Sequence, residues 1–323
     1  MSNSNQLEMM ERIALDLEGV ERALASSFNT GSEDFNTLIR PLSEAGGKRL
    51  RAQLCLLIAN AGISVEEERI KIAEAVEMLH LATLIHDDVL DQAEIRRGEE
   101  TIHKHKGNKV AILSGDYLFA KAFRIVSEMP HMEYLKVFSH IITCLVEGEF
   151  MQMEDVYRID QGIDRYMTKT QKKTADFMEG CMELGGLLGG WSSDEIMYLK
   201  RYGHALGMAF QITDDIMDYR ETSDTTGKPV GNDLREGLLT YPLLSIVNES
   251  NQNQLLQDIK NLNHGGNEQE IIDYVIAQGG IDNTLRVAQQ YCDDALSALQ
   301  SIRDFDGKEF LVLAVQNLAD RKV

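Results

Sequence analysis

The stretch from His80 to Arg97 reads HLATLIHDDVLDQAEIRR, and it combines helical apolar spacing with three carboxylates. Asp87, Asp88 and Asp91 stand at i, i+1 and i+4, so a helix directs them toward one side. Like charges placed this close together destabilise an isolated helix. We therefore expect a cationic group opposite these three aspartates.

A second copy of this spacing lies far along the chain, in the run FQITDDIMD, where Asp214, Asp215 and Asp218 repeat the D-D-x-x-D pattern. One such cluster is as readily an ordinary solvated helix face. Two identical clusters, each preceded by apolar sequence, favour a shared cationic centre between two facing helices. Carboxylate oxygens are hard ligands that suit Mg²⁺, together with waters and phosphate oxygens. The residues thus predict bound Mg²⁺ and a phosphorylated substrate.

Composition points to an all-α protein. The chain has 323 residues, of which 43% are hydrophobic and 26% charged, with only four prolines and little strand-like alternation. No linker is long enough to divide it, so a single domain over residues 1–323 is expected. The net charge of −20 argues against a nucleic-acid partner, because phosphate backbones require clustered Lys and Arg.

The cysteines and the N-terminal sequence indicate a cytoplasmic protein. The four cysteines show no paired or metal-type spacing and lie in apolar helical sequence, as reduced core residues do. The first twenty residues, MSNSNQLEMMERIALDLEGV, have neither the basic nor the continuous apolar region of a secretory signal. No run of eighteen apolar residues is present to span a bilayer.

Apolar spacing and Gly or Pro breaks predict a succession of helices. The Asn/Gln-rich stretch 248–269 is expected to be a connection. His103 and His105 are expected in a polar loop, where histidines usually meet solvent rather than a metal. The expected helices cover residues 6–27, 33–45, 65–92, 111–127, 133–153, 163–185 and 194–219.

Basic residues lie close to both acidic motifs in the sequence. Lys48 and Arg51 follow a Gly-Gly break, where charge and backbone N–H groups are both available to an anion. Arg96 and Arg97 follow the first motif and suit bidentate phosphate contact, although a salt bridge to the aspartates is the competing interpretation. A lysine face at 169, 172 and 173 is either a solvated stripe or directed at a phosphate. Lys228 lies in the polar loop after the second motif.

The motifs GGKRLR, LIHDDVLDQAEIRRG, KKTADF, FQITDDIMD and GKPVGNDLREG, in this order, closely resemble those of trans-isoprenyl diphosphate synthases. The resemblance covers the chain from Gly46 to about Leu244 and is greatest to bacterial long-chain enzymes, including heptaprenyl diphosphate synthase catalytic subunits. It implies an all-α orthogonal helical bundle of the isoprenoid synthase type around a deep central cavity. It also implies a homodimer, or a heteromer with a small regulatory subunit.

The same resemblance assigns roles residue by residue. The substrates would be isopentenyl diphosphate and an allylic diphosphate. Asp87, Asp91 and Asp214 would be direct Mg²⁺ ligands, supported by Asp88, Asp215 and Asp218. The allylic diphosphate would be held by Arg96, Lys173, Thr174, Gln211 and Lys228. The isopentenyl diphosphate would be held by Lys48, Arg51, His80 and Arg97, with a C-terminal tail that Arg321 and Lys322 match loosely.

Leu238 bears on substrate affinity, and Ala82 and Thr83 bear on product length. Many relatives have a second Lys where this chain has Leu238, so one phosphate contact is missing. Ala82 and Thr83 lie about one turn before the first motif, where the resembling short-chain enzymes carry aromatic residues that stop the growing chain. The small side chains here predict a product of about six to eight isoprene units, because a close-packed ring would otherwise block the path. The stop is expected deeper, near the helix from Phe138 to Phe150.

Other functions remain open from the sequence. A class I terpene cyclase shares the first acidic cluster but normally carries an Asn/Ser/Glu pattern in place of the second. A non-catalytic partner subunit generally lacks intact motifs, and a plain helical binding module explains neither the aspartates nor the basic stretches. Within the resembling family, a short-chain farnesyl or geranylgeranyl diphosphate synthase is the alternative.

Overall fold

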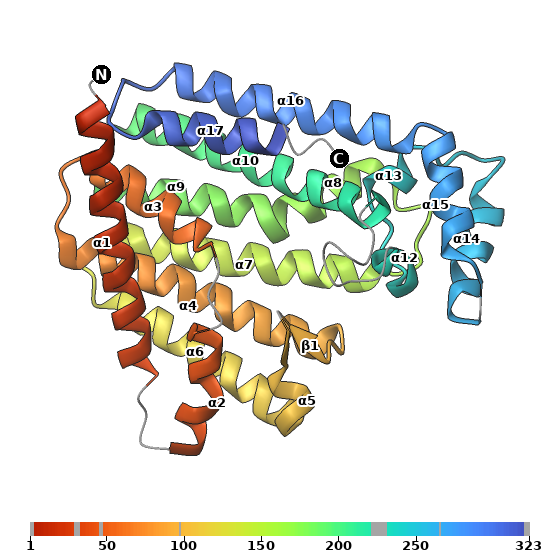
Figure 1. Ribbon diagram of the computed structural model, residues 1–323, viewed down its shortest axis with the longest axis horizontal. Coiled ribbons are helices and arrows are strands. Elements are labelled where there is room, and N and C mark those ends of the chain that lie inside the picture. The colour runs from red at the N-terminus through yellow and green to blue at the C-terminus, as the bar shows by residue number, and fades with distance from the viewer. Residues whose placement is uncertain are drawn as a thin grey trace. The chain divides into compact units, whose positions relative to one another are not determined.

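Helices account for almost all regular structure in the computed structural model (Figure 1). The residues that it describes are 3–28, 33–44, 48–96, 98–220, 231–264 and 266–319. Their strands are confined to one antiparallel hairpin, β1 (Ile95–Arg96) with β2 (Glu99–Glu100). The predicted all-α class is confirmed. Over the described residues, no helix is both long enough and apolar enough to cross a membrane.

The chain forms two compact units. Unit 1 comprises Met1–Ser139, Gly180–Met197 and Asp304–Gly307, and unit 2 comprises His140–Glu179, Tyr198–Arg303 and Lys308–Val323. Three helices begin in one unit and end in the other, namely α7 (Met132–Glu154), α9 (Asp176–Leu188) and α10 (Ser193–Arg220).

Unit 1 is built around α4 (Glu66–Leu90), which carries the first acidic motif and is buried on all sides over residues 72–79. Such a helix needs neighbours around its whole circumference. It packs against α1 (Asn3–Ser27), α3 (Leu50–Asn60) and α6 (Asn108–Ser127). Unit 1 also contains α2 (Glu33–Glu44) and α5 (Ile102–Lys106).

Two buried carboxylates inside α4 are compensated by partners from the neighbouring segments. Glu77 accepts a hydrogen bond from the backbone N–H of Ala52 at the start of α3 (3.1 Å), and it pairs with Arg49 (3.3 Å). Glu74 accepts a 2.6 Å hydrogen bond from Ser27. A buried charge is tolerated only when paired in this way, so these contacts fix where α1 and α3 pack on α4.

Unit 2 contains the second acidic motif on α10. Its core gathers buried side chains such as Ile212, Ile216, Leu243 and Ile272. Helices α16 (Gly280–Gln300) and α17 (Lys308–Ala319) run side by side (Figure 1). The remaining elements are α8 (Gly162–Thr170), a π-helical turn η1 (Gln171–Ala175), α12 (Asn232–Glu236), α13 (Tyr241–Leu244), α14 (Gln252–Asn261), η2 (Leu262–His264) and α15 (Glu268–Ala277).

The structure corrects three expectations from the sequence. The helix predicted over 163–185 is interrupted by the π turn η1, so it divides into α8, η1 and α9. The stretch 248–269 contains α14, because Leu255 and Ile259 are buried at helical spacing despite the polar composition. The segment with His103 forms the short helix α5, whose first turn is capped when the Thr101 hydroxyl accepts from the Lys104 N–H.

Candidate active site

The first acidic motif lies at the C-terminal end of α4 in unit 1. The helix ends at Leu90, but the N–H of Asp91 still donates to the Asp87 carbonyl (2.8 Å), which continues the helical pattern by one residue. Gln92 then adopts a left-handed backbone (φ 51°), and this stops the helix. Asp87 is half-buried, Asp88 is 4% exposed and Asp91 is exposed.

The buried member of this motif has a cationic partner. Arg96 Nε donates to Asp88 Oδ1 at 2.6 Å, across the turn that leads into the hairpin. This is the salt bridge that the sequence left as an alternative to phosphate binding. A charge-assisted hydrogen bond of this length holds the guanidinium beside the motif. Arg97 lies outside the described residues.

The described residues that the resemblance assigns to isopentenyl diphosphate lie in unit 1 and differ in exposure. Lys48 is exposed before α3, and its carbonyl accepts a 2.5 Å hydrogen bond from Gln53. The Arg51 guanidinium approaches the His80 ring (3.4 Å), and its pKa is lowered by burial. Between Lys48 and Arg51, Arg49 pairs with Glu21 of α1 at 2.7 Å. This ion pair joins the start of α3 to α1. The resemblance assigns Arg51 and His80 to one substrate, and the structure brings these two side chains together.

The proposed chain-length residues lie on α4 in different surroundings. The Ala82 methyl group is fully buried. Thr83 is half-buried, and its hydroxyl donates to the His80 carbonyl (2.8 Å) within the same turn. Of the two, only Thr83 offers accessible surface in unit 1.

The second acidic motif, on α10 in unit 2, repeats the burial pattern of the first. Asp214 is half-buried and Asp215 is 3% exposed. The Asp215 carboxylate accepts hydrogen bonds from the Tyr166 hydroxyl and from Gln211 Nε2 (3.1 Å). Thr174 in turn donates to Gln211 Oε1 (3.0 Å). Two residues assigned to the allylic substrate, Thr174 and Gln211, thus hold the buried carboxylate in a continuous chain of hydrogen bonds.

Asp218 contacts the residues at the start of α12. Its carboxylate accepts the backbone N–H groups of Asn232 (3.0 Å) and Asp233 (3.2 Å) at the start of α12, and its carbonyl accepts from Gly231. Free N–H groups at a helix start favour such a carboxylate. Lys228 lies outside the described residues. Leu238, where relatives carry a second Lys, is half-buried after α12.

The lysines before α9 point to separate acidic partners. Lys169 is buried, lies 3.7 Å from Asp155 and donates to Gln161 (3.3 Å); burial lowers its pKa. Lys172 pairs with Glu147 and Lys173 with Glu149, each at 2.5 Å. Lys172 and Lys173 both lie in the π turn η1, a feature that is frequent at functional sites.

Tyr166 is the residue that sequence reasoning missed. It reaches Asp215 from α8, and neither its spacing nor its surroundings in the sequence distinguish it from a core tyrosine. Burial raises the pKa of Asp215 to about 6, although its hydrogen bonds from Tyr166 and Gln211 oppose that shift. The folded protein therefore binds this proton more tightly than the unfolded chain does. Stability that Asp215 contributes below about pH 4 is consequently lost as the pH rises to about 6.

Tyr166→Phe is expected to lower the free energy of unfolding at neutral pH by about 1.5–3 kcal/mol, because a buried carboxylate loses a hydrogen bond. The loss of stability with rising pH should also extend to higher pH than in the wild type. Urea unfolding at several pH values, in EDTA, measures both effects. Tyr202→Phe is the matched control, since it removes a buried hydroxyl that donates to the Leu311 carbonyl instead. An unchanged pH dependence in Tyr166→Phe would contradict the assignment.

Comparisons with known proteins identify the family of this chain. A family model for polyprenyl synthetase matches residues 32–278. Octaprenyl diphosphate synthase of Escherichia coli (strain K12) is 33% identical over 312 residues, 95% of this chain and 96% of that protein. Heptaprenyl diphosphate synthase component 2 of Geobacillus stearothermophilus is 33% identical over 288 residues, covering 89% of this chain and 90% of that protein.

Solved structures similar to this chain are also polyprenyl synthases. Heptaprenyl diphosphate synthase from Staphylococcus aureus superimposes with a TM-score of 0.88 and 28% identity, covering 96% of this chain and 99% of that one. A polyprenyl synthase from Caulobacter crescentus CB15, complexed with calcium and isoprenyl diphosphate, superimposes with a TM-score of 0.87 and 30% identity. The match covers 100% of this chain and 98% of that one.

Proposed function

Since this chain belongs to the polyprenyl synthetase family and is a prenyltransferase, we propose that it makes a long-chain trans-polyprenyl diphosphate in Mg²⁺-dependent steps. Each step condenses isopentenyl diphosphate head-to-tail onto an allylic diphosphate. The observation that carries the proposal is the shared pattern of the two acidic motifs. In each, the second aspartate is buried and fixed by hydrogen bonds, while the first is half-buried.

The donor set fits a hard divalent ion. Asp87, Asp91 and Asp214 would hold Mg²⁺ through carboxylate oxygens, the ligands it prefers. When bound, the ion neutralises the diphosphate and makes it a better leaving group. The complex of a similar polyprenyl synthase with calcium and isoprenyl diphosphate supports a divalent ion in this chain. The contacts of Asp88, Asp215 and Asp218 with the protein suit supporting rather than direct ligands.

The basic and polar side chains divide between two substrates. The allylic diphosphate is assigned Arg96, Lys173, Thr174, Gln211 and Lys228. The isopentenyl diphosphate is assigned Lys48, Arg51, His80 and Arg97. The Lys and Arg side chains assigned to the allylic diphosphate would stabilise charge that grows on its leaving oxygens. In the free protein, Arg96 and Lys173 pair with Asp88 and Glu149, so they exchange a carboxylate for a phosphate when the substrate binds.

The reaction then needs little further help from the protein. The bond to the allylic carbon breaks, and the double bond of isopentenyl diphosphate attacks the resulting cation. The released diphosphate takes the proton that restores the double bond. Apolar helices must exclude water, because hydration of the cation ends the reaction.

The product is proposed to be long, about six to eight isoprene units, since no aromatic ring at Ala82 or Thr83 fills the space before the first motif. Long-chain activities in the names of similar proteins, octaprenyl and heptaprenyl, support this length. The protein is proposed to act as a homodimer. The name of the Geobacillus protein, component 2, leaves a heteromer as the alternative, which purified homodimer with full activity would exclude.

Incubation of the purified protein with Mg²⁺, isopentenyl diphosphate and a series of allylic primers tests the function. A linear polyprenyl diphosphate is expected. A cyclic hydrocarbon would identify a terpene cyclase. No turnover with any primer would contradict the proposal for the chain acting alone.

Lys48→Ala is expected to raise the KM for isopentenyl diphosphate about tenfold or more, with a smaller effect on the allylic primer. Arg96→Ala should do the reverse. One charge-assisted hydrogen bond contributes about 1.5–3 kcal/mol, which accounts for an effect of this size. Initial rates with each substrate varied in turn provide the measurement, and Lys71→Ala, an exposed lysine on α4, is the control. Equal effects of both variants on both substrates would remove the two-site assignment.

A further inference from the structure

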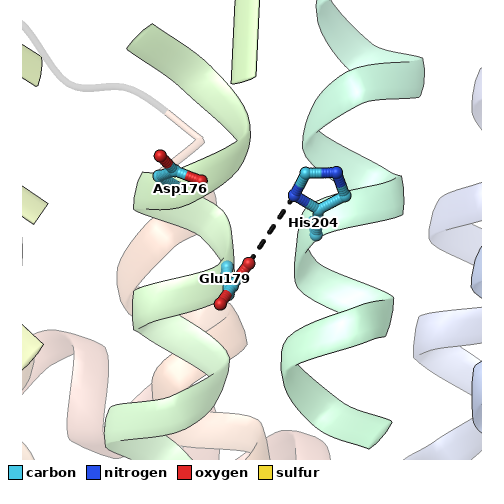
Figure 2. A group of neighbouring side chains, drawn as sticks. All are labelled: Asp176, Glu179 and His204. Carbon is cyan, nitrogen blue, oxygen red and sulfur yellow. Dashed lines mark ion pairs between the residues drawn. The ribbon is translucent and has the colours of Figure 1, made fainter. Parts of the chain in front are cut away.

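Unit 2 brings together side chains of the types that bind metals and that belong to neither acidic motif (Figure 2). Asp176 and Glu179 lie one turn apart on α9, and His204 lies opposite them on α10. One ligand atom from each of the three lies within 4.8 Å of the other two. His204 Nδ1 is 3.6 Å from Glu179 Oε2. The side chains thus converge from two helices on one point.

Close packing of the two helices explains the convergence. A Cβ atom on Gly207 would lie only 2.6 Å from the Cα of Ala175, so α10 can approach η1 only because this residue is glycine. His204 lies one turn before Gly207, and Asp176 directly follows Ala175. The same approach that makes Gly207 necessary therefore sets the imidazole against the start of α9.

A buried thiol provides an independent observation at the same place. Cys144 of α7 is 4% exposed, and it is hydrogen-bonded to the Asp176 carboxylate, which is itself 7% exposed. Burial, and then this contact, raises the pKa of the thiol to about 12. Cys144 Sγ also lies 3.6 Å from His140 Nε2. Three helices of unit 2 thus contribute sulfur, nitrogen and oxygen donors to one small region.

We propose that Asp176, Glu179 and His204 bind a divalent ion of the Zn²⁺ class, with Cys144 as the fourth ligand. Mg²⁺ prefers oxygen donors and retained waters, whereas imidazole and thiolate favour Zn²⁺ and its transition-metal neighbours. Four-coordinate Zn²⁺ with bonds of about 2.0–2.3 Å places its donors roughly 3.4 Å apart. The ligand atoms of Asp176, Glu179 and His204 lie within 4.8 Å of one another, and Cys144 adjoins them through its contact with Asp176.

The neighbouring charge is compatible with an ion. Lys200 Nζ lies 3.5 Å from Glu179 Oε1, one turn before His204. Burial raises the pKa of Glu179, but the hydrogen bond from His204 and the charge of Lys200 outweigh it, so that pKa lies below its usual value. The partly exposed Lys200 amine can turn toward solvent, since such surface ion pairs contribute little.

The site joins α9 to α10, the helix that holds the second acidic motif. Thr174, two residues before Asp176, donates to Gln211, and Gln211 donates to Asp215. An ion that clamps α9 to α10 would fix the relative position of these hydrogen-bonding partners. Zn²⁺ binding is accordingly expected to raise the melting temperature of the protein, by linkage between binding and folding.

Co²⁺ serves as the spectroscopic probe, added to the full-length protein under anaerobic conditions with excess Mg²⁺. The wild type should bind one equivalent with the visible bands of four-coordinate Co²⁺ and a near-ultraviolet thiolate band, both displaced by Zn²⁺. His204→Ala and Glu179→Gln should each weaken binding at least about tenfold, because even outer-shell changes cost this much. Cys144→Ser should lose the thiolate band.

Controls separate this site from the others. His131→Ala removes an exposed histidine in unit 1 and should leave the bands unchanged. Asp214→Ala removes a proposed Mg²⁺ ligand and should also leave them unchanged. Circular dichroism verifies that each variant is folded, and His204→Gln replaces His204→Ala if the latter is not. A wild type without the visible bands, or folded Glu179→Gln and His204 variants with undiminished affinity, would overturn the site. A wild type without the thiolate band would overturn the role of Cys144.

Discussion

Asp214→Ala is expected to lower kcat for prenyl elongation on the order of a thousandfold or more, because a metal ligand contributes several kcal/mol to stabilising the leaving diphosphate. Asp214 is half-buried on α10, next to the fixed carboxylate of Asp215. Because Asp214 is half-buried, loss of its carboxylate removes a proposed ligand without opening a cavity in the apolar core. Asp87→Ala should have the same effect through the first motif. Incorporation of labelled isopentenyl diphosphate measures the loss.

The controls for these variants are carboxylates on the same helices. Asp194 is exposed in the first turn of α10, and Glu67 is exposed in the first turn of α4. Asp194→Ala and Glu67→Ala should keep wild-type turnover. Far-ultraviolet circular dichroism establishes that all four variants are helical. Near-normal turnover in a folded Asp214→Ala or Asp87→Ala protein would be incompatible with the proposed metal ligands.

Thr83→Phe is expected to shorten the product to about three or four isoprene units without stopping catalysis, because an aromatic ring does not fit beside a chain in close-packed surroundings. Thr83 lies one turn before Asp87 on α4 and retains accessible surface. A chain whose charged end is held at the acidic motif must therefore pass this level. Chromatography of the dephosphorylated products measures the length distribution.

Two further variants, a control and a second aromatic substitution, accompany Thr83→Phe. Thr83→Val keeps the size of the side chain and should keep the long product. Ala82→Phe is also expected to shorten the product, but Ala82 is fully buried, so the ring adds an overpacking cost of about 1–3 kcal/mol. An active Thr83→Phe enzyme with the wild-type product distribution would contradict the open-path argument. So would a wild type that already stops at three or four units.

Most helix positions could be predicted because the periodic spacing of apolar residues is visible in a single sequence. The helices around both acidic motifs match their predicted bounds to within about two residues, the usual uncertainty of helix ends. The failures have local causes. Residues 248–269 are polar overall, but two buried side chains, Leu255 and Ile259, are enough to dock α14. The π turn at Gln171–Ala175 leaves no mark in the apolar spacing on either side.

The sequence by itself determined the all-α class, the two aspartate motifs and the family, because these depend on residue type and spacing. Only the tertiary structure decided which carboxylates are buried and what holds them. Tyr166 reaches Asp215 from another helix, and Arg96 turns back onto Asp88. The convergence of Asp176, Glu179 and His204 is of the same kind. Which side chains are buried, and which of them meet, depends on which helices pack together. Helix packing brings together residues that are far apart in the sequence, and no periodic spacing in the sequence predicts such contacts.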